Sequence, residues 1–298
     1  MSKYIAHLDI PFNGPPGFFK NQIYTKEEWR LYEHYFEEVK SIFADREDKQ
    51  LYSTIVEGRR AQLGHVKNFS SIMKPMLWQY IEFINRAQVK TIIDAGVYNG
   101  CQIITFFRFF RNLTSVYGFE PMIKYYLQGQ FIEYLDQLNV KVLPLALWNF
   151  KTRKKFFEAR DETSSRIIKK ASALSKAEKH FYMKQEYINT ITVDDFVFKN
   201  KIKVDYIKLD VEGAEYETLQ GAKKAFKKYR PQISVSIYHH KKDLFKIPLL
   251  LKNTLENYKY KIAHYSSVYP ETVLYAIPNE IYDRKQMISY RDFGQKKL

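Results

Sequence analysis

One group of residues in this sequence has the types and spacing of a turn that binds a nucleoside. Asp94 follows a short apolar run directly, and Gly96 and Gly100 come next with Tyr98 and Asn99 between them. Glycine lets the backbone pass close to a ligand and lets the following helix pack tightly on a sheet. The sequence therefore predicts a ligand-binding turn at the carboxyl end of a strand, where open α/β sheets bind their ligands.

An acidic residue further along the chain belongs with this turn. Glu120 ends the next apolar run, just before Pro121, and a carboxylate at that place can accept both hydroxyl protons of a ribose. A dinucleotide site needs the order G-x-G-x-x-G and a helix start that faces a pyrophosphate. This turn instead has the spacing G-x-x-x-G, and Asp94 would repel a pyrophosphate while suiting an ammonium or a sulfonium. The pattern therefore favours S-adenosylmethionine as the cofactor.

A second polar group lies in the segment 208–215, after a later apolar run. Lys208 and Asp210 share one face of the expected strand, because strand side chains alternate. Asp210 then stands beside the glycine turn, and Lys208 either polarises a substrate oxygen or pairs with Asp210. Gly213 permits a close turn, and Glu215 is explained by the preference for acids in the first turn of a helix. Asp210 and Lys208 are therefore candidate catalytic residues.

The elements that must position these residues alternate between short apolar runs and amphipathic helices. From residue 90 onward, strands are expected at 91–94, 115–120, 140–147, 204–210 and 232–239, and helices at 99–110, up to 138 and from 214 to 228. Such alternation predicts a mostly parallel sheet with right-handed crossovers. Two further runs, 258–266 and 272–278, look like a terminal antiparallel pair. The expected fold is a Rossmann-like α/β domain with a seven-stranded sheet whose last strand reverses.

The first 89 residues lack strand alternation and predict a helical extension. Thr25 is a candidate N-cap for a helix with apolar residues at helical spacing, namely Trp29, Tyr32, Tyr35, Phe36 and Val39. A second helical run covers about 71–87, and a Pro/Gly-rich segment at 11–17 precedes both. We expect residues 1–89 to pack as an extension on a Rossmann-like domain of residues 90–298.

The stretch 151–186 interrupts the alternation. It is polar, carries the runs KTRKK and RIIKK, and predicts one helix near 172–185. A long polar insertion at the ligand-facing rim of an α/β sheet is a candidate lid. A solvated excursion without a role in binding is the alternative.

Composition limits the function classes only broadly. The chain is 45% hydrophobic and 27% charged, which is ordinary for a globular protein. Its net charge of +15 raises the local concentration of any anionic partner, whether nucleic acid, a membrane surface, a nucleotide sugar or an acidic polysaccharide. The single cysteine, Cys101, excludes an internal disulfide and fits a reducing compartment. The sequence has neither a signal-peptide core nor an apolar run of about 20 residues that could span a bilayer, so a cytoplasmic protein is expected.

Several segments resemble the FkbM family of S-adenosylmethionine-dependent O-methyltransferases: IDAGVYNG, GFEP, ITVDDF and above all DYIKLDVEGAEYETLQGA. The likeness runs from about residue 90 to 278. It implies a class I methyltransferase fold and an enzyme that methylates hydroxyls, often on sugars of surface polysaccharides, antibiotics or nucleotide-linked precursors. We therefore expect a small-molecule or glycan acceptor, anionic like a nucleotide-diphosphate sugar or a capsule or lipopolysaccharide precursor, and no nucleic-acid partner.

The resemblance also assigns cofactor contacts. The turn at 94–100 would hold the methionine end, Glu120 the ribose, and the pair at 146–147, Ala-Leu, would border the adenine. Family members often continue with Ser-Asp or Ser-Asn, whereas this chain has Trp-Asn at 148–149. A serine pair at 164–165 lies where the family has a short pair of serines in the lid region.

Transfer of a methyl group to an alcohol needs activation of a poor nucleophile. A general base or a metal ion is therefore expected beside the cofactor, and the candidates follow neighbouring strand ends: Asp210, His239, His240, Asp243 and His264. In one mechanism His239 or His240 is the base, oriented by Asp210 or Asp243. In the other, Asp210 with His239 or His264 holds a divalent cation. The sequence has no tight metal-ligand signature, which favours the base.

Three other functions compete with this interpretation. The basic charge would suit an RNA-directed methyltransferase, but no zinc-binding cysteine set is present, and DVEG replaces the [DN]PP[YFW] typical of enzymes that methylate exocyclic nitrogens. A non-catalytic nucleotide-binding Rossmann protein would not need the acids and histidines at the strand ends. An NAD-dependent oxidoreductase is disfavoured by the glycine spacing.

Overall fold

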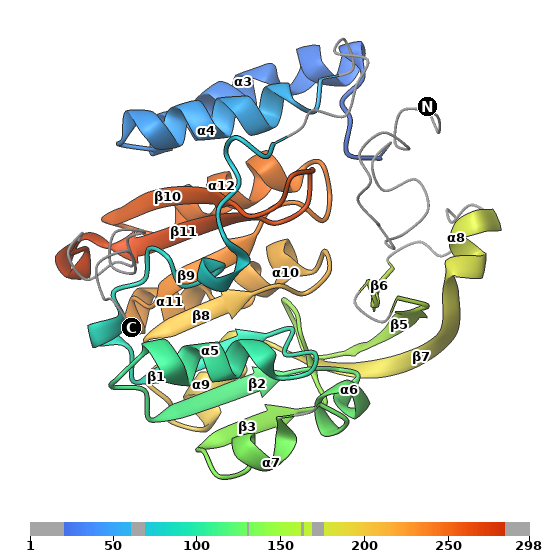
Figure 1. The fold of residues 1–298 in the computed structure, drawn as a ribbon, viewed down its shortest axis with the longest axis vertical. Coiled ribbons are helices and arrows are strands. Elements are labelled where there is room, and N and C mark those ends of the chain that lie inside the picture. The colour runs from blue at the N-terminus through green and yellow to red at the C-terminus, as the bar shows by residue number, and fades with distance from the viewer. Residues whose placement is uncertain (1–20, 61–68, 130, 162–163, 169–175, 284–298) are drawn as a thin grey trace, which may run out of the picture.

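The computed structural model describes residues 21–60, 69–129, 131–161, 164–168 and 176–283. A seven-stranded sheet in the order β10-β11-β9-β8-β1-β2-β3 forms its centre (Figure 1). The strands are β1 (Thr91–Ala95), β2 (Ser115–Phe119), β3 (Val140–Leu143), β8 (Tyr206–Leu209), β9 (Gln232–Ser236), β10 (Tyr258–His264) and β11 (Thr272–Pro278). All neighbours pair in parallel except β11, which runs antiparallel to both β9 and β10. The predicted Rossmann-like α/β fold is confirmed, including the reversed last strand.

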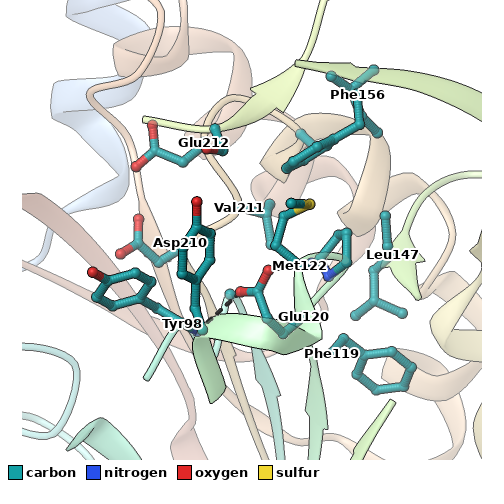
Figure 2. A pocket seen from close by; sticks show the side chains of 16 residues that line it. Tyr98, Phe119, Glu120, Met122, Leu147, Phe156, Asp210, Val211 and Glu212 are labelled. Carbon is teal, nitrogen blue, oxygen red and sulfur yellow. Dashed lines mark hydrogen bonds between the residues drawn. The ribbon is translucent and has the colours of Figure 1, made fainter. Parts of the chain in front are cut away.

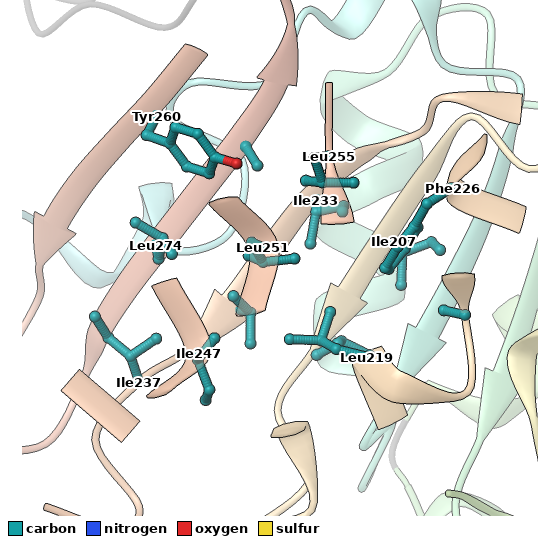
Figure 3. Close-up of a cluster of buried hydrophobic side chains, with 14 of the residues drawn as sticks. Ile207, Leu219, Phe226, Ile233, Ile237, Ile247, Leu251, Leu255, Tyr260 and Leu274 are labelled. Atoms are coloured by element: carbon teal, nitrogen blue, oxygen red, sulfur yellow. The ribbon is translucent and has the colours of Figure 1, made fainter. Parts of the chain in front are cut away.

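Helices cover both faces of this sheet: α5 (Cys101–Phe109), α6 (Ile123–Leu127), α7 (Ile132–Leu135), α9 (Val193–Lys199), α10 (Glu215–Gln220), α11 (Lys223–Tyr229) and α12 (Asp243–Thr254). The adjacent residues Ile92 and Ile93 belong to different hydrophobic clusters, because strand side chains alternate between the faces. Figure 3 shows one of these clusters, in which Ile207 and Ile233 of the sheet meet Leu219 and Leu251 of the helices. Burial on both faces explains why the strands read as continuous apolar runs.

The predicted bounds of one strand and one helix were wrong. The run 140–147 does not form one strand: β3 stays in the main sheet, and β4 (Ala146–Leu147) pairs with β7 in a second sheet. Pro144 separates them, since proline has no N–H to continue a ladder. The helix expected up to residue 138 is divided into α6 and α7.

The helix predicted for 71–87 is absent. This described segment holds only the short 3-10 turns η2 (Met76–Trp78) and η3 (Arg86–Gln88). Tyr80 between them has a left-handed backbone, with φ 68°, and its hydroxyl lies 3.0 Å from Ser236 Oγ on β9. Tertiary contacts of this buried tyrosine have therefore overridden the helical pattern.

The insertion forms the second sheet, in the order β4-β7-β5-β6. Its other strands are β5 (Arg153–Ala159), β6 (Arg166–Ile167) and β7 (Tyr182–Ile191), and α8 (Lys176–Phe181) precedes β7. The helix expected near 172–185 thus appears as α8, while residues 169–175 are outside the described part. Figure 1 shows the long strands β5 and β7 extending from the carboxyl edge of the main sheet.

Two helices of the N-terminal region, α3 (Lys26–Ile42) and α4 (Arg46–Glu57), lie beside β10 and α12 (Figure 1). Thr25 caps α3 as predicted: its side chain accepts the amide of Glu28, and the Glu28 carboxylate accepts the amide of Thr25. The expected Pro/Gly-rich segment at 11–17 is outside the described residues. No helix in the described ranges is long and apolar enough to span a bilayer.

Aromatic contacts and one buried ion pair attach these helices to the sheet. The ring of Phe36 lies 5.7 Å from that of Phe245 on α12, and the ring of Tyr35 stacks on Phe245 at 5.1 Å. Asp48 of α4 accepts a 2.6 Å bond from Lys261 of β10, and both side chains are buried. The region 21–60 is thus continuous with the hydrophobic core of the sheet.

We expect Phe36→Ala to lower the free energy of unfolding by about 3–5 kcal/mol, because a buried aromatic ring would leave a cavity. Leu31→Ala on the same helix is the control and should change it by about 0.5 kcal/mol or less, since Leu31 is 59% exposed and Phe36 only 4%. Urea denaturation of the two variants measures the difference. Equal stabilities would contradict the packing of α3 described above.

Candidate active site

The turn after β1 makes a close contact with the end of β8. Gly96 has φ +82°, and a Cβ there would lie 1.7 Å from the carbonyl oxygen of Asp210. The amide of Asp210 donates to the carbonyl of Ala95 at 3.0 Å. Only glycine fits such an approach, so Gly96 places Asp210 directly beside the turn, as the sequence predicted.

A buried ion pair lies beneath this turn. Asp94 and Lys208 face each other in the β1–β8 register, and Lys208 Nζ lies 3.0 Å from Asp94 Oδ1. Nζ also donates to the carbonyls of Ala95 at 3.2 Å and Gly96 at 2.7 Å. The sequence left open whether Lys208 polarises a substrate oxygen or pairs with Asp210; in the structure it pairs with Asp94 and binds the backbone of the turn.

An open pocket begins at this turn (Figure 2). Six of the residues assigned to the cofactor line it: Gly96, Tyr98, Glu120, Pro121, Ala146 and Leu147. The other three, Asp94, Asn99 and Gly100, do not line the pocket. Their contacts are within the turn and with the elements packed against it. Asp94 pairs with Lys208, and the Asn99 side chain accepts the amide of Cys101 at the start of α5. A Cβ on Gly100 would lie 2.6 Å from a Leu135 methyl carbon.

Two backbone amides hold the side chain of Glu120 in one orientation. Tyr98 N–H donates to Oε2 at 2.9 Å and Met122 N–H donates to Oε1 at 2.8 Å. Burial raises the pKa of Glu120, and these two amides counteract the shift. Within the described residues each carboxylate oxygen accepts one hydrogen bond. An ionised carboxylate oxygen can accept a second, so Glu120 can accept two further hydrogen bonds from a ligand in the pocket.

The pocket has an apolar and an acidic end. Figure 2 shows Met122, Leu147 and Phe156 gathered on one side of Glu120, with Asp210 and Glu212 on the other. Met122, Tyr125, Phe156 and Ile167 were missed by sequence reasoning, since Phe156 and Ile167 belong to the unforeseen second sheet. Of the serine pair, Ser165 lines the pocket, while the Ser164 hydroxyl bonds Asp161.

Trp148 and Asn149, where the chain departs from the family pattern, do not line the pocket. The buried Trp148 donates its amide to the carbonyl of Ile191 on β7, and Asn149 Nδ2 donates to the Gln220 side chain. The departure therefore affects contacts with β7 and α10 rather than the pocket wall.

At the acidic end, Asp210, Glu212 and His239 form a cluster whose ligand atoms all lie within 4.8 Å of one another. His239 Nε2 is 3.6 Å from Asp210 Oδ1 and 3.3 Å from Glu212 Oε1. Its Nδ1 is 2.9 Å from Glu215 Oε1, and Glu215 also accepts the amide of Val211. Of these carboxylates, that of Glu215 therefore lies nearest to the His239 ring, whereas the sequence suggested Asp210 or Asp243 as its partner.

The charges of this cluster influence one another. Burial opposes the charged form of His239, but the carboxylates of Glu212 and Glu215 hold its pKa well above the usual value. Burial also opposes ionisation of Asp210, yet Lys208 and His239 lower its pKa. Ser236 Oγ donates to Asp210 Oδ1 at 3.0 Å. His239 and the carboxylates around it therefore favour one another's charged forms.

The other candidates lie outside this cluster. His240 is exposed, and its ring packs on Gly213, where a Cβ would lie 2.5 Å from Nε2. The His240 amide donates to the buried Asp243, whose pKa burial raises to about 7. His264 is fully buried, its Nδ1 lies 2.9 Å from Thr272 Oγ1, and burial lowers its pKa to about 4. His264 is thus not brought to Asp210 and His239.

The N-terminal region supports the loop that carries His239. Gln22 Nε2 donates to the carbonyl of His239 at 3.1 Å, and the Tyr24 hydroxyl bonds the carbonyl of Lys241. The fully buried Arg59 donates to Gln22 Oε1 at 2.5 Å and to the carbonyl of Tyr269 at 3.0 Å. These bonds connect the segment before α3 with the loops after β9 and β10.

One solved structure has a similar architecture. A crystal structure of methyltransferase FkbM from Methylobacillus flagellatus KT matches with a TM-score of 0.64 and 16% identity, over 84% of this chain and 60% of that one. The chain thus spans less than two thirds of that protein. Two other structures are more distant. An rRNA methylase from Streptococcus thermophilus has a TM-score of 0.38 and 11% identity, over 64% of this chain and 88% of that one. Spermidine synthase from Thermotoga maritima has a TM-score of 0.39 and 10% identity, over 74% of this chain and 65% of that one. No curated protein matches the chain.

The sequence model of the methyltransferase FkbM domain matches residues 94–262. This range begins at the aspartate of the first turn and includes Glu120, the cluster around Asp210, and His239. It covers more than half of the 298 residues, and the chain therefore belongs to the FkbM methyltransferase family.

Proposed function

We propose that the protein is an S-adenosylmethionine-dependent O-methyltransferase that methylates a sugar hydroxyl, on a nucleotide-linked sugar or a precursor of a bacterial surface polysaccharide. The observation that carries the proposal is the side chain of Glu120. Two amides fix it in the pocket between an apolar and an acidic end. The family likeness supports methyl transfer, and the chemistry of the acidic end supports a hydroxyl as the acceptor.

The pocket fits the parts of S-adenosylmethionine in order. Glu120 would accept the two ribose hydroxyls, since each of its oxygens can accept a second hydrogen bond. Met122, Leu147 and Phe156 offer apolar surface to an adenine ring. The backbone at Gly96 and the carboxylate of Asp210 lie on the other side, where a positively charged sulfonium and ammonium would be stabilised.

The acidic end can position a hydroxyl for methyl transfer. The cofactor supplies a methyl group on a positively charged sulfur, so the protein mainly orients the acceptor and draws away its proton. Asp210 lines the pocket and touches His239, and its side chain is 26% exposed. A hydroxyl group that enters here can donate a hydrogen bond to Asp210. This bond would align the hydroxyl oxygen with the methyl group and make that oxygen a stronger nucleophile.

The basic charge of the chain supports an anionic acceptor. Arg166 lies between Ser165 and Ile167, which both line the pocket, although Arg166 itself is not one of the lining residues. Its Nε donates to the Tyr182 hydroxyl at 2.7 Å, and its positive charge opposes the rise that burial causes in the pKa of Glu212 at the acidic end. A nucleotide-diphosphate sugar would bring its phosphates near this cation and its sugar hydroxyls to the acidic end.

We expect the wild-type protein to bind S-adenosylhomocysteine saturably in calorimetric titration and not to bind NADH. Glu120→Ala should weaken the affinity at least about tenfold, since charge-assisted hydrogen bonds contribute about 1.5–3 kcal/mol. Glu133→Ala removes the same charge from an exposed position on α7 and should leave the affinity unchanged. Equal affinities in the two variants would exclude the ribose role of Glu120.

His239→Gln should lower methyl transfer by about 10²-fold or more, because His239 lies beside Asp210, to which the hydroxyl would donate, and positioned proton-transfer groups contribute about that much. The affinity for S-adenosylhomocysteine should stay close to wild type. The assay transfers a radiolabelled methyl group to a panel of nucleotide sugars. His240→Gln changes the exposed neighbour and is the control. Wild-type turnover in His239→Gln would remove His239 from the chemistry.

A further inference from the structure

Three potential ligand atoms at the acidic end, one each from Asp210, Glu212 and His239, all lie within 4.8 Å of one another. His239 Nε2 lies 3.3 Å from Glu212 Oε1 and 3.6 Å from Asp210 Oδ1. Within the described part of the chain, neither Nε2 nor Nδ1 makes a hydrogen bond of good geometry. Ligand atoms held about 2.1 Å from a shared metal lie about 3.0 Å apart at adjacent octahedral positions and about 3.4 Å apart in a tetrahedron. The observed separations are close to this range.

The side chain of His239 is buried and aimed at the two carboxylates. It is 3% exposed, whereas Glu212 is 27% exposed. On its other side, Glu215 Oε1 lies 2.9 Å from Nδ1, where it can accept the Nδ1 proton. A carboxylate behind the distal ring nitrogen is the usual arrangement of a metal-ligating histidine, because it fixes the tautomer that leaves Nε2 free to coordinate.

The negative charges of the carboxylates around His239 also favour the binding of a cation. Asp210, Glu212 and Glu215 surround one imidazole, so the acids outnumber the histidine even when it is protonated. Lys208 is bonded to Asp94 and the turn. A dication between Asp210 and Glu212 would offset the repulsion between these carboxylates.

We propose that Asp210, Glu212 and His239 bind one divalent cation, with Glu215 as the positioning residue of His239. Two carboxylates and one imidazole suit a first-row transition metal such as Mn²⁺ better than Mg²⁺ or Ca²⁺, which prefer oxygen alone. Asp210 and Glu212 also line the cofactor pocket, so the cation would act as a Lewis acid toward the acceptor hydroxyl. That role rests on the proposed function; the binding of the cation does not.

The test is a titration of metal-free protein with Mn²⁺, followed by electron paramagnetic resonance and calorimetry. We expect one saturable site whose affinity falls at least about tenfold in Glu212→Gln. Glu215→Gln should weaken it about 10–100-fold, as loss of an outer-shell partner does. Glu217→Gln removes the same charge from α10 outside the cluster and should bind Mn²⁺ like wild type. Glu212 is partly exposed, so its variant is expected to fold, which circular dichroism checks.

A spectroscopic signature separates coordination from simple charge attraction. The imidazole nitrogen of His239 should modulate the electron spin echo of bound Mn²⁺, and His239→Gln should abolish this modulation. Absence of a saturable site in wild type, or equal affinity in Glu212→Gln and Glu217→Gln, would overturn the proposal. Titration of the same samples with S-adenosylhomocysteine keeps the two proposals apart: cofactor binding without Mn²⁺ binding overturns the cation site alone, and the reverse overturns the cofactor assignment alone.

Discussion

The ion pair between Asp94 and Lys208 is the interaction on which the site depends. It joins the two central strands, β1 and β8, at the level where both reach the pocket. Lys208 also binds the carbonyl of Gly96, so the same cation fixes the turn that approaches Asp210. Removing one member of such a buried pair leaves an uncompensated charge, at a cost of about 3–5 kcal/mol. The position of Asp210 beside the pocket therefore depends on an ion pair whose two residues do not line the pocket.

Much of the fold was predictable because its signals are local. Strands buried on both faces produce apolar runs that alternate with amphipathic helices, and all seven strands of the main sheet appeared close to their expected places. The failures arose where distant contacts override the local pattern. Tyr80 adopts a left-handed backbone within a segment of helical spacing. The second sheet is rich in lysine and arginine on its exposed positions, which made a paired element look like a solvated insertion.

The site was predictable in its parts and less so in their relations. The residues of the turn, Glu120 and Asp210 could be assigned because strand ends converge at one edge of a parallel sheet. The partners of Lys208 and His239 could not be assigned, since they depend on side-chain register across strands and helices. Glu215 is an example of a partner that the sequence did not reveal. An acid in the first turn of a helix has a sufficient local explanation, and that explanation concealed its contact with His239.

The hydrogen bond from Gln22 to the carbonyl of His239 indicates which part of the chain folds as one unit. The segment that resembles the family begins at residue 94, but the loop after β9 is supported by Gln22, which precedes α3, and by Arg59, which follows α4. A chain trimmed to the family-matching boundaries would leave that carbonyl without its amide partner and expose the apolar surface of α12. The limits of shared ancestry and the limits of cooperative folding therefore do not coincide in this protein.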